Sequence, residues 1–144
     1  MDTITINKNL NNLKGFIGTF PRDGLPKRVA TPCSLVVNTD PSHGQGQHWI
    51  AIFIDKNGVG EYFDSYGLAP LYKEFIDFLN NNCSNGYFYN NKMLQCLTCV
   101  TCGHYCIAYI KIRTNGISYN EFIKLFTNNQ LMNDKLIRKY VNFS

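Results

Sequence analysis

The 144-residue sequence contains no apolar run of the roughly 18 residues that a membrane-spanning helix needs. Residues 1–10 carry polar side chains throughout and lack the apolar core of a secretory signal. No low-complexity linker and no internal repeat interrupts the chain. These absences predict one intracellular domain, 1–144, that is not secreted and has no membrane partner.

Neither sign of charge predominates strongly, because 14 basic residues against 10 acidic ones leave a net charge of only +4. Like charges form no run. This balance excludes a dedicated nucleic-acid binder and permits only weak DNA binding. A hydrophobic fraction of 44% and an aromatic fraction of 14% exclude a disordered tail and fit a packed globular domain.

Histidine is rare, with three residues, whereas cysteine occurs six times. Inside a cell, cysteines act more often as thiols, metal ligands or nucleophiles than as disulfides. Cys96, Cys99, Cys102 and Cys106 have the spacing of a bacterial ferredoxin run, so a metal or iron–sulfur binding module is one alternative. Against it, Ile rather than Pro follows the last cysteine, and the chain offers no second run and no second ligand pair for zinc. We therefore predict no metal ligand, and interpret Cys33, Cys99 and Cys106 as small buried side chains.

Strand patterns come first in the chain and helix patterns follow. Runs of β-branched and aromatic residues predict strands at 33–38, 48–54 and 59–64. Apolar residues at helical spacing predict helices that begin at Pro70, at Gly103, at the capping box Ser118–Glu121, and at Asn133 or Asp134. The stretches 15–32 and 82–91 are expected to be irregular. This order predicts an α+β fold: a small antiparallel or mixed sheet packed against helices, with Cys102 at the N-terminus of a central helix.

Cys102 is set apart by its place in front of the predicted helix 103–113. The positive end of a helix dipole favours a thiolate and lowers the thiol pKa from about 8.5. A thiolate nucleophile needs a histidine partner. His104 should face away from Cys102 and His43 lies in a polar loop, so His48, at the start of a strand, is the candidate base.

Asp64 is the residue expected to orient His48. A three-residue turn at 56–58 places the two side chains on one face of a hairpin, one diagonal step apart, whereas a two-residue turn at 57–58 places them on opposite faces. The candidate oxyanion donors are a backbone N–H at Cys102 or Gly103 and the side-chain amide of Gln95, seven residues before Cys102.

These segments, in this order, resemble the adenovirus endopeptidase (adenain) family of cysteine proteases, whose fold is shared with ubiquitin-like-protein proteases. The matching stretches are 16–20, 33–39, 48–49, 63–67, Gln95 and 102–106. The resemblance implies that His48 is the general base, Asp64 its orienting partner, Gln95 the oxyanion donor and Cys102 the nucleophile. Trp49 and Gly103, beside His48 and Cys102, would then support substrate and oxyanion binding.

The function implied by the resemblance is a thiol endopeptidase that cleaves viral or transposon capsid precursors next to small residues, often Gly, during maturation. Adenovirus enzymes carry Glu where this chain has Asp64, and ubiquitin-like-protein proteases carry Asp. A deubiquitinase or ubiquitin-like-protein isopeptidase acting on host conjugates is therefore the alternative. Compact relatives in Maverick or Polinton transposons fit the short chain. The resemblance implies a monomer in the host nucleus or cytoplasm or packaged in virions, acting on protein substrates.

The chemistry itself is expected to need no cofactor, because each catalytic role is filled by a side chain. Adenovirus enzymes are stimulated by DNA and by a viral peptide, which can be held through a cysteine. Cys83, twelve residues before Gln95, falls near that place. The resemblance thus implies an activating peptide or DNA, and a buried thiol is the alternative interpretation of Cys83.

Overall fold

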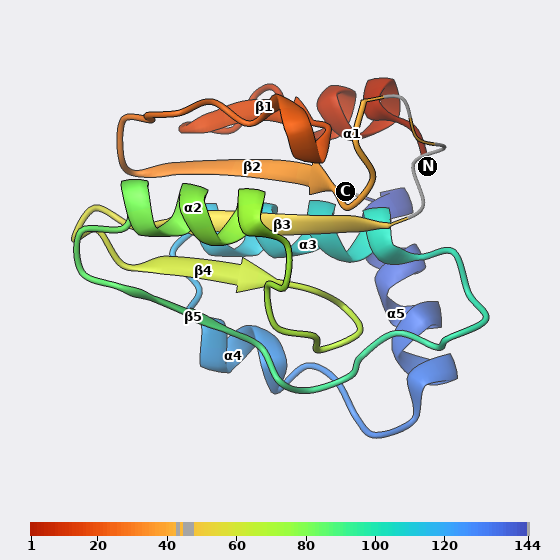
Figure 1. The fold of residues 1–144 in the computed structure, drawn as a ribbon. Coiled ribbons are helices and arrows are strands. Elements are labelled where there is room, and N and C mark those ends of the chain that lie inside the picture. The colour runs from red at the N-terminus through yellow and green to blue at the C-terminus, as the bar shows by residue number, and fades with distance from the viewer. Residues whose placement is uncertain (43, 45–47, 144) are drawn as a thin grey trace.

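The computed structural model describes residues 1–42, 44 and 48–143 as a five-stranded sheet with helices on both faces (Figure 1). The strands follow one another across the sheet in chain order. They are β1 (Phe16–Phe20), β2 (Cys33–Asn38), β3 (Trp49–Ile54), β4 (Gly60–Phe63) and β5 (Tyr87–Tyr89). The β2–β3 and β3–β4 pairs are antiparallel, whereas β1 and β5 join the two edges in parallel. The predicted α+β fold with a mixed sheet is confirmed.

Helix α3 (Cys102–Thr114) lies behind the sheet and α2 (Lys73–Asn82) lies in front of it (Figure 1). The remaining helical segments are α1 (Thr3–Leu10), the 3-10 turn Arg22–Gly24, α4 (Tyr119–Ile123) and α5 (Gln130–Phe143). Helix α3 buries most of its side chains, including consecutive ones from Tyr105 to Ile110, because β3 covers one side and α1, α4 and α5 cover others. Among the described residues, no helix has the length and apolar character to cross a bilayer.

The strands of the central sheet bury side chains on both faces. In β2, Leu35 and Val37 pack with the side chains of α2, while Val36 packs with those of α3. Successive side chains of a strand point to opposite faces, so a sheet covered on both sides needs apolar residues at nearly every position. This explains why 33–38 and 49–54 are continuous apolar runs rather than alternating ones.

The β3–β4 hairpin has the three-residue turn on which the site prediction depends. Ile54 pairs with Gly60, and the Asp55 N–H donates to the Val59 carbonyl at 3.0 Å. Gly58 closes the turn with φ of 79°, and a Cβ there would lie 2.0 Å from the Ser84 hydroxyl oxygen. Both conditions require glycine at this position.

Two edge strands contradict the prediction of irregular chain. Residues 16–20 form β1, and the segment 82–91 contains β5. Both strands are short, and neither contains a fully buried residue; β1 is also interrupted by Gly18 with φ of 131°. Their pairing in parallel with strands distant in sequence, rather than an apolar pattern of their own, makes them strands.

One helix and two helix starts also differ from the prediction. Helix α1 was not predicted, because only Ile6 and Leu10 of its mostly polar sequence are buried. Helix α2 begins at Lys73, not at Pro70. Helix α5 begins at Gln130, and the Asn129 side chain accepts from the Met132 N–H at 3.1 Å. The expected caps, Asn133 and Asp134, instead lie buried within that helix.

A buried ion pair joins the back of the sheet to α3. Glu61 of β4, 3% exposed, accepts from the Arg113 guanidinium at 2.8 Å (Nε) and 2.6 Å (Nη2) and from the Tyr109 hydroxyl. Removing one partner of a buried pair leaves the other charge without compensation, which costs more than the pair contributes.

We expect Arg113→Met to lower the free energy of unfolding by about 3–5 kcal/mol, because it leaves the Glu61 carboxylate buried without its cation. Urea denaturation measures this change. Lys73→Met, which removes the exposed Lys73–Asp77 pair of α2, is the matched control and should have little effect. Equal effects of the two substitutions would show that the Glu61–Arg113 pair does not stabilise the fold.

Candidate active site

Three elements bring the predicted catalytic residues together. His48 directly precedes β3, Asp64 directly follows β4, and Cys102 is the first residue of α3. Because β3 and β4 are antiparallel, the start of one lies beside the end of the other. Helix α3 packs against β3, which places its N-terminus at the same end of the sheet.

The predicted contact between His48 and Asp64 is present. His48 Nε2 lies 2.8 Å from Asp64 Oδ1, and Asp64 is 4% exposed. The Tyr66 N–H donates to the same carboxylate oxygen at 2.8 Å, and the Tyr66 ring stacks on the imidazole with 4.6 Å between ring centroids. Asn90 fixes the backbone of Asp64 by accepting from its N–H at 2.9 Å and donating to its carbonyl at 2.7 Å.

Cys102 meets the other side of the imidazole. The His48 side chain and the backbone N–H groups of Trp49 and Gly103 lie close enough to its sulfur to lower the Cys102 pKa. Because Nε2 is taken by Asp64, the nitrogen that faces the sulfur is Nδ1.

The electrostatic interactions among Asp64, His48 and Cys102 favour a thiolate–imidazolium pair. Burial opposes protonation of His48, but the hydrogen bonds and charges of Asp64 and Cys102 outweigh it and raise the His48 pKa to about 9. Burial likewise opposes ionisation of Cys102, yet His48 and the backbone N–H groups of Trp49 and Gly103 lower its thiol pKa below the ordinary value. Both shifts favour the thiolate form of Cys102, which is the nucleophilic form of a cysteine.

Gln95 is completely buried beside Cys102, and its side-chain amide is held at both ends. The Ser65 hydroxyl donates to Gln95 Oε1 at 2.5 Å, and Gln95 Nε2 donates to the Cys99 carbonyl at 2.7 Å. Gln95 and Cys102 line the same small pocket. The position suits the predicted oxyanion donor.

The other predicted residues divide between the site and the core. Trp49 and Gly103 adjoin Cys102, as expected. Cys83 lies at the end of α2, 7% exposed, and burial raises its pKa to about 11, which favours the buried-thiol interpretation. His104 is not a hydrogen-bond partner of Cys102, whereas His43 lies outside the described residues.

The predicted burial of cysteines is correct for Cys33 and Cys106 and wrong for Cys99, which is half-exposed on the loop before α3. The alternative of a metal site made of Cys96, Cys99, Cys102 and Cys106 is also wrong, because the fold does not bring these four side chains together. Among the described residues, the side chains near enough to share an ion are Cys96, Cys99 and Asp134. Cys106 is buried in the core instead.

Three supporting residues were missed by the sequence analysis: Ser65, Tyr66 and Asn90. Ser65 and Tyr66 directly follow Asp64, so their proximity to the site was a signal, although their partners were not. Asn90 gave no signal, because it reaches Asp64 only through the pairing of β4 with β5.

No protein-family model matches the sequence. The chain is 33% identical over 112 residues to the SUMO-1 cysteine protease of African swine fever virus (a Kenyan pig isolate), and the match covers 67% of this chain and 40% of that protein. It has the same identity and coverage with the cysteine protease of a Malawian tick isolate. The chain thus spans about 40% of the length of these curated relatives.

Solved structures agree with these relatives. The crystal structure of the African swine fever virus pS273R protease superposes with a TM-score of 0.55 and 29% identity, covering 74% of this chain and 43% of that one. The chain is therefore similar to a viral cysteine protease in both sequence and structure. The central domain of an uncharacterised Legionella pneumophila protein shares the fold alone, with a TM-score of 0.51 and 14% identity over 99% of this chain and 97% of that one. The expected resemblance to cysteine proteases is confirmed, whereas the adenain family and a transposon source stay predictions.

The pH dependence of hydrolysis at this site should report the thiolate–imidazolium pair. We expect kcat/KM to fall at acid pH as the thiolate is protonated, and at alkaline pH, around pH 9, as His48 loses its proton. Asp64→Asn removes the carboxylate that stabilises the imidazolium, so the alkaline limb should move down by roughly one to three units. The exposed Asp77→Asn is the control. An alkaline limb that stays in place in Asp64→Asn would contradict the assigned role of Asp64.

Ser65 is predicted to act as a positioning residue for Gln95. Ser65→Ala should lower kcat roughly tenfold with little change in KM, and Gln95→Ala roughly 10²- to 10³-fold. The double variant should be no slower than Gln95→Ala, because both changes remove one function. The alkylation rate of Cys102 by iodoacetamide should stay constant throughout, and a large drop in that rate in Ser65→Ala would show general damage to the site instead.

Proposed function

We propose that this chain is a thiol protease that cleaves the C-terminal tails of ubiquitin-like proteins. The observation that carries the proposal is the arrangement of four side chains. Asp64 orients the His48 imidazole, which lies next to the Cys102 sulfur, and a fixed Gln95 amide lies beside them. The curated relatives described as SUMO-1 cysteine proteases support this substrate class.

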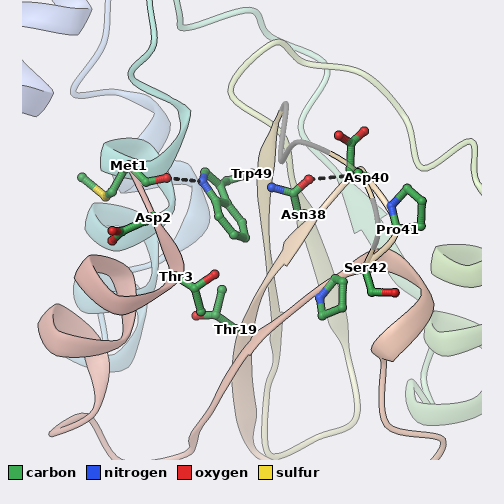
Figure 2. Close-up of a pocket in the computed structure, with 11 residues that line it drawn as sticks. Met1, Asp2, Thr3, Thr19, Asn38, Asp40, Pro41, Ser42 and Trp49 are labelled. Atoms are coloured by element: carbon green, nitrogen blue, oxygen red, sulfur yellow. Dashed lines mark hydrogen bonds between the residues drawn. The ribbon is translucent and has the colours of Figure 1, made fainter.

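The surface around Cys102 suits an extended peptide. A pocket of about 310 Å³ lies over Cys102 and Gln95, and a cleft of about 430 Å³ lies on the other side of Trp49. Met1 and Trp49 line both. Figure 2 shows the Trp49 indole between Met1, whose carbonyl accepts from Nε1 at 3.0 Å, and Asn38. A peptide that occupies both hollows would pass Met1 and Trp49 beside Cys102, and we expect the residues nearest the reacting bond to be small, as in a Gly-rich tail.

The reaction would follow from the arrangement of these groups. The Cys102 thiolate attacks the carbonyl carbon of the scissile bond, and the resulting oxyanion accepts hydrogen bonds from Gln95 Nε2 and a backbone N–H at the start of α3. His48 gives its proton to the leaving amine as the C–N bond breaks, which leaves a thioester on Cys102. Water then attacks the thioester with His48 as base, releasing the acid and restoring the thiolate.

Maturation cleavage of viral capsid precursors is the second candidate, and the viral source of the relatives favours it. Either kind of substrate would occupy the same pocket over Cys102. Cofactor-free chemistry, stimulation by a peptide or DNA, a monomeric state and an intracellular location stay predictions.

The nucleophile assignment predicts that Cys102→Ala lowers hydrolysis of a SUMO-1 aminomethylcoumarin substrate roughly 10³-fold or more. It should also abolish labelling by a SUMO-1 vinyl sulfone, because the label forms a bond with the thiolate. Cys33→Ala, which removes a buried sulfur away from the site, is the matched control and should keep both signals.

A peptide coumarin substrate with the same C-terminal residues separates the two candidates. Strong preference for the SUMO-1 substrate would support the proposal. Equal rates on the peptide would favour a maturation endopeptidase, and absence of both hydrolysis and labelling in the unmodified chain would overturn the thiol-protease assignment.

A further inference from the structure

A second cluster of reactive side chains lies on the loop that leads into α3. The Sγ atoms of Cys96 and Cys99 and a carboxylate oxygen of Asp134 all lie within 4.8 Å of one another. A tetrahedral zinc ion with Zn–S bonds of about 2.3 Å separates its sulfur ligands by about 3.8 Å. Small side-chain adjustments would therefore bring these three atoms to zinc-binding distances.

A tight turn brings the two cysteines together. The Cys99 N–H donates to the Cys96 carbonyl at 3.1 Å, so the C-x-x-C segment folds back on itself and both side chains leave the turn close to each other. Thr98, inside the turn, places its hydroxyl oxygen 3.2 Å from the Cys96 sulfur. Both cysteines are half-exposed, so an ion can reach them from solvent.

Asp134 is 1% exposed and is held in place from three directions. Its Oδ1 accepts from the Tyr105 hydroxyl at 2.8 Å and the Thr101 hydroxyl at 3.1 Å. Its Oδ2 accepts from the Cys96 N–H at 3.2 Å. Metal-binding carboxylates are oriented by such donors, and each oxygen has two lone pairs, so Oδ2 can still coordinate an ion.

We propose that Cys96, Cys99 and Asp134 bind a Zn²⁺ ion, with water as the fourth ligand. Two thiolates and one carboxylate suit Zn²⁺ rather than Mg²⁺ or Ca²⁺, which prefer oxygen ligands alone. This departs from the sequence-based expectation of no metal ligand. That expectation rested on the lack of a second ligand pair, and the fold supplies a single ligand from α5, 35 residues after Cys99.

The ion would connect the loop 96–101 to α5 next to the catalytic site. The carbonyl of Cys99 is the acceptor for Gln95 Nε2, so a bound ion would hold the group that orients the oxyanion donor. Its role is structural, because the nucleophile and its base lie outside the ligand set.

The test uses the full chain with Cys102→Ala, which prevents zinc from binding to the catalytic thiol. The protein is kept reduced with a phosphine, incubated with Zn²⁺ and passed through a desalting column, and retained metal is measured with a chromophoric chelator. We expect one zinc per chain, a higher melting temperature that EDTA reverses, and thiolate-to-metal charge transfer with tetrahedral d–d bands when Co²⁺ replaces zinc.

Adding Cys96→Ala or Cys99→Ala to this background should abolish metal retention and the cobalt bands, whereas adding Cys33→Ala should preserve both. Circular dichroism checks that each variant is folded. Unchanged zinc retention in Cys96→Ala, Cys99→Ala or Asp134→Asn would overturn the ligand assignment. So would a reduced parent chain that retains no zinc. Because none of these measurements needs a substrate, they are independent of the proposed protease function.

Discussion

The catalytic arrangement depends on the register between β3 and β4. Side chains alternate between the faces of a strand, so a shift by one residue would send His48 and Asp64 to opposite faces of the sheet. The three-residue turn closed by Gly58 fixes that register, and Ser84 leaves no room there for a side chain. A feature of the turn at one end of the hairpin thus determines whether a hydrogen bond forms at the other end.

Once the register is fixed, the charges of the site follow from competition between burial and neighbours. Burial alone would leave both His48 and Cys102 neutral. The Asp64 carboxylate reverses this for the imidazole, and the imidazolium together with two backbone N–H groups reverses it for the thiol. Asp64 can do so because Tyr66 and Asn90 hold it in place. The ionised form of His48 and Cys102 therefore depends on Asp64 and on the residues that hold it, and not on these two side chains alone.

Much of this could be predicted from the sequence. The central strands and α3 are long apolar runs, and their patterns indicate burial wherever they pack. A three-residue turn at 56–58 predicts His48 on the same face as Asp64, and the structure has that turn and that contact. The edge strands β1 and β5 could not be predicted in this way, because their own residues give little signal and partners far along the chain make them strands. Asn90 reaches Asp64 through that same pairing, so the contact was hidden for the same reason.

The loop 95–101 shows what sequence patterns leave out. It has no regular secondary structure, so its order has to come from side-chain contacts with other elements. Ser65, next to Asp64, holds its first residue, and Asp134 of α5 holds Cys96 and Thr101. A segment spaced like a ferredoxin run is therefore divided by the fold. Its first two cysteines face a carboxylate, the third faces the imidazole, and the fourth packs in the core. A motif-like spacing along the chain does not imply a shared role. The first two cysteines lie on the loop, whereas the third and fourth belong to α3.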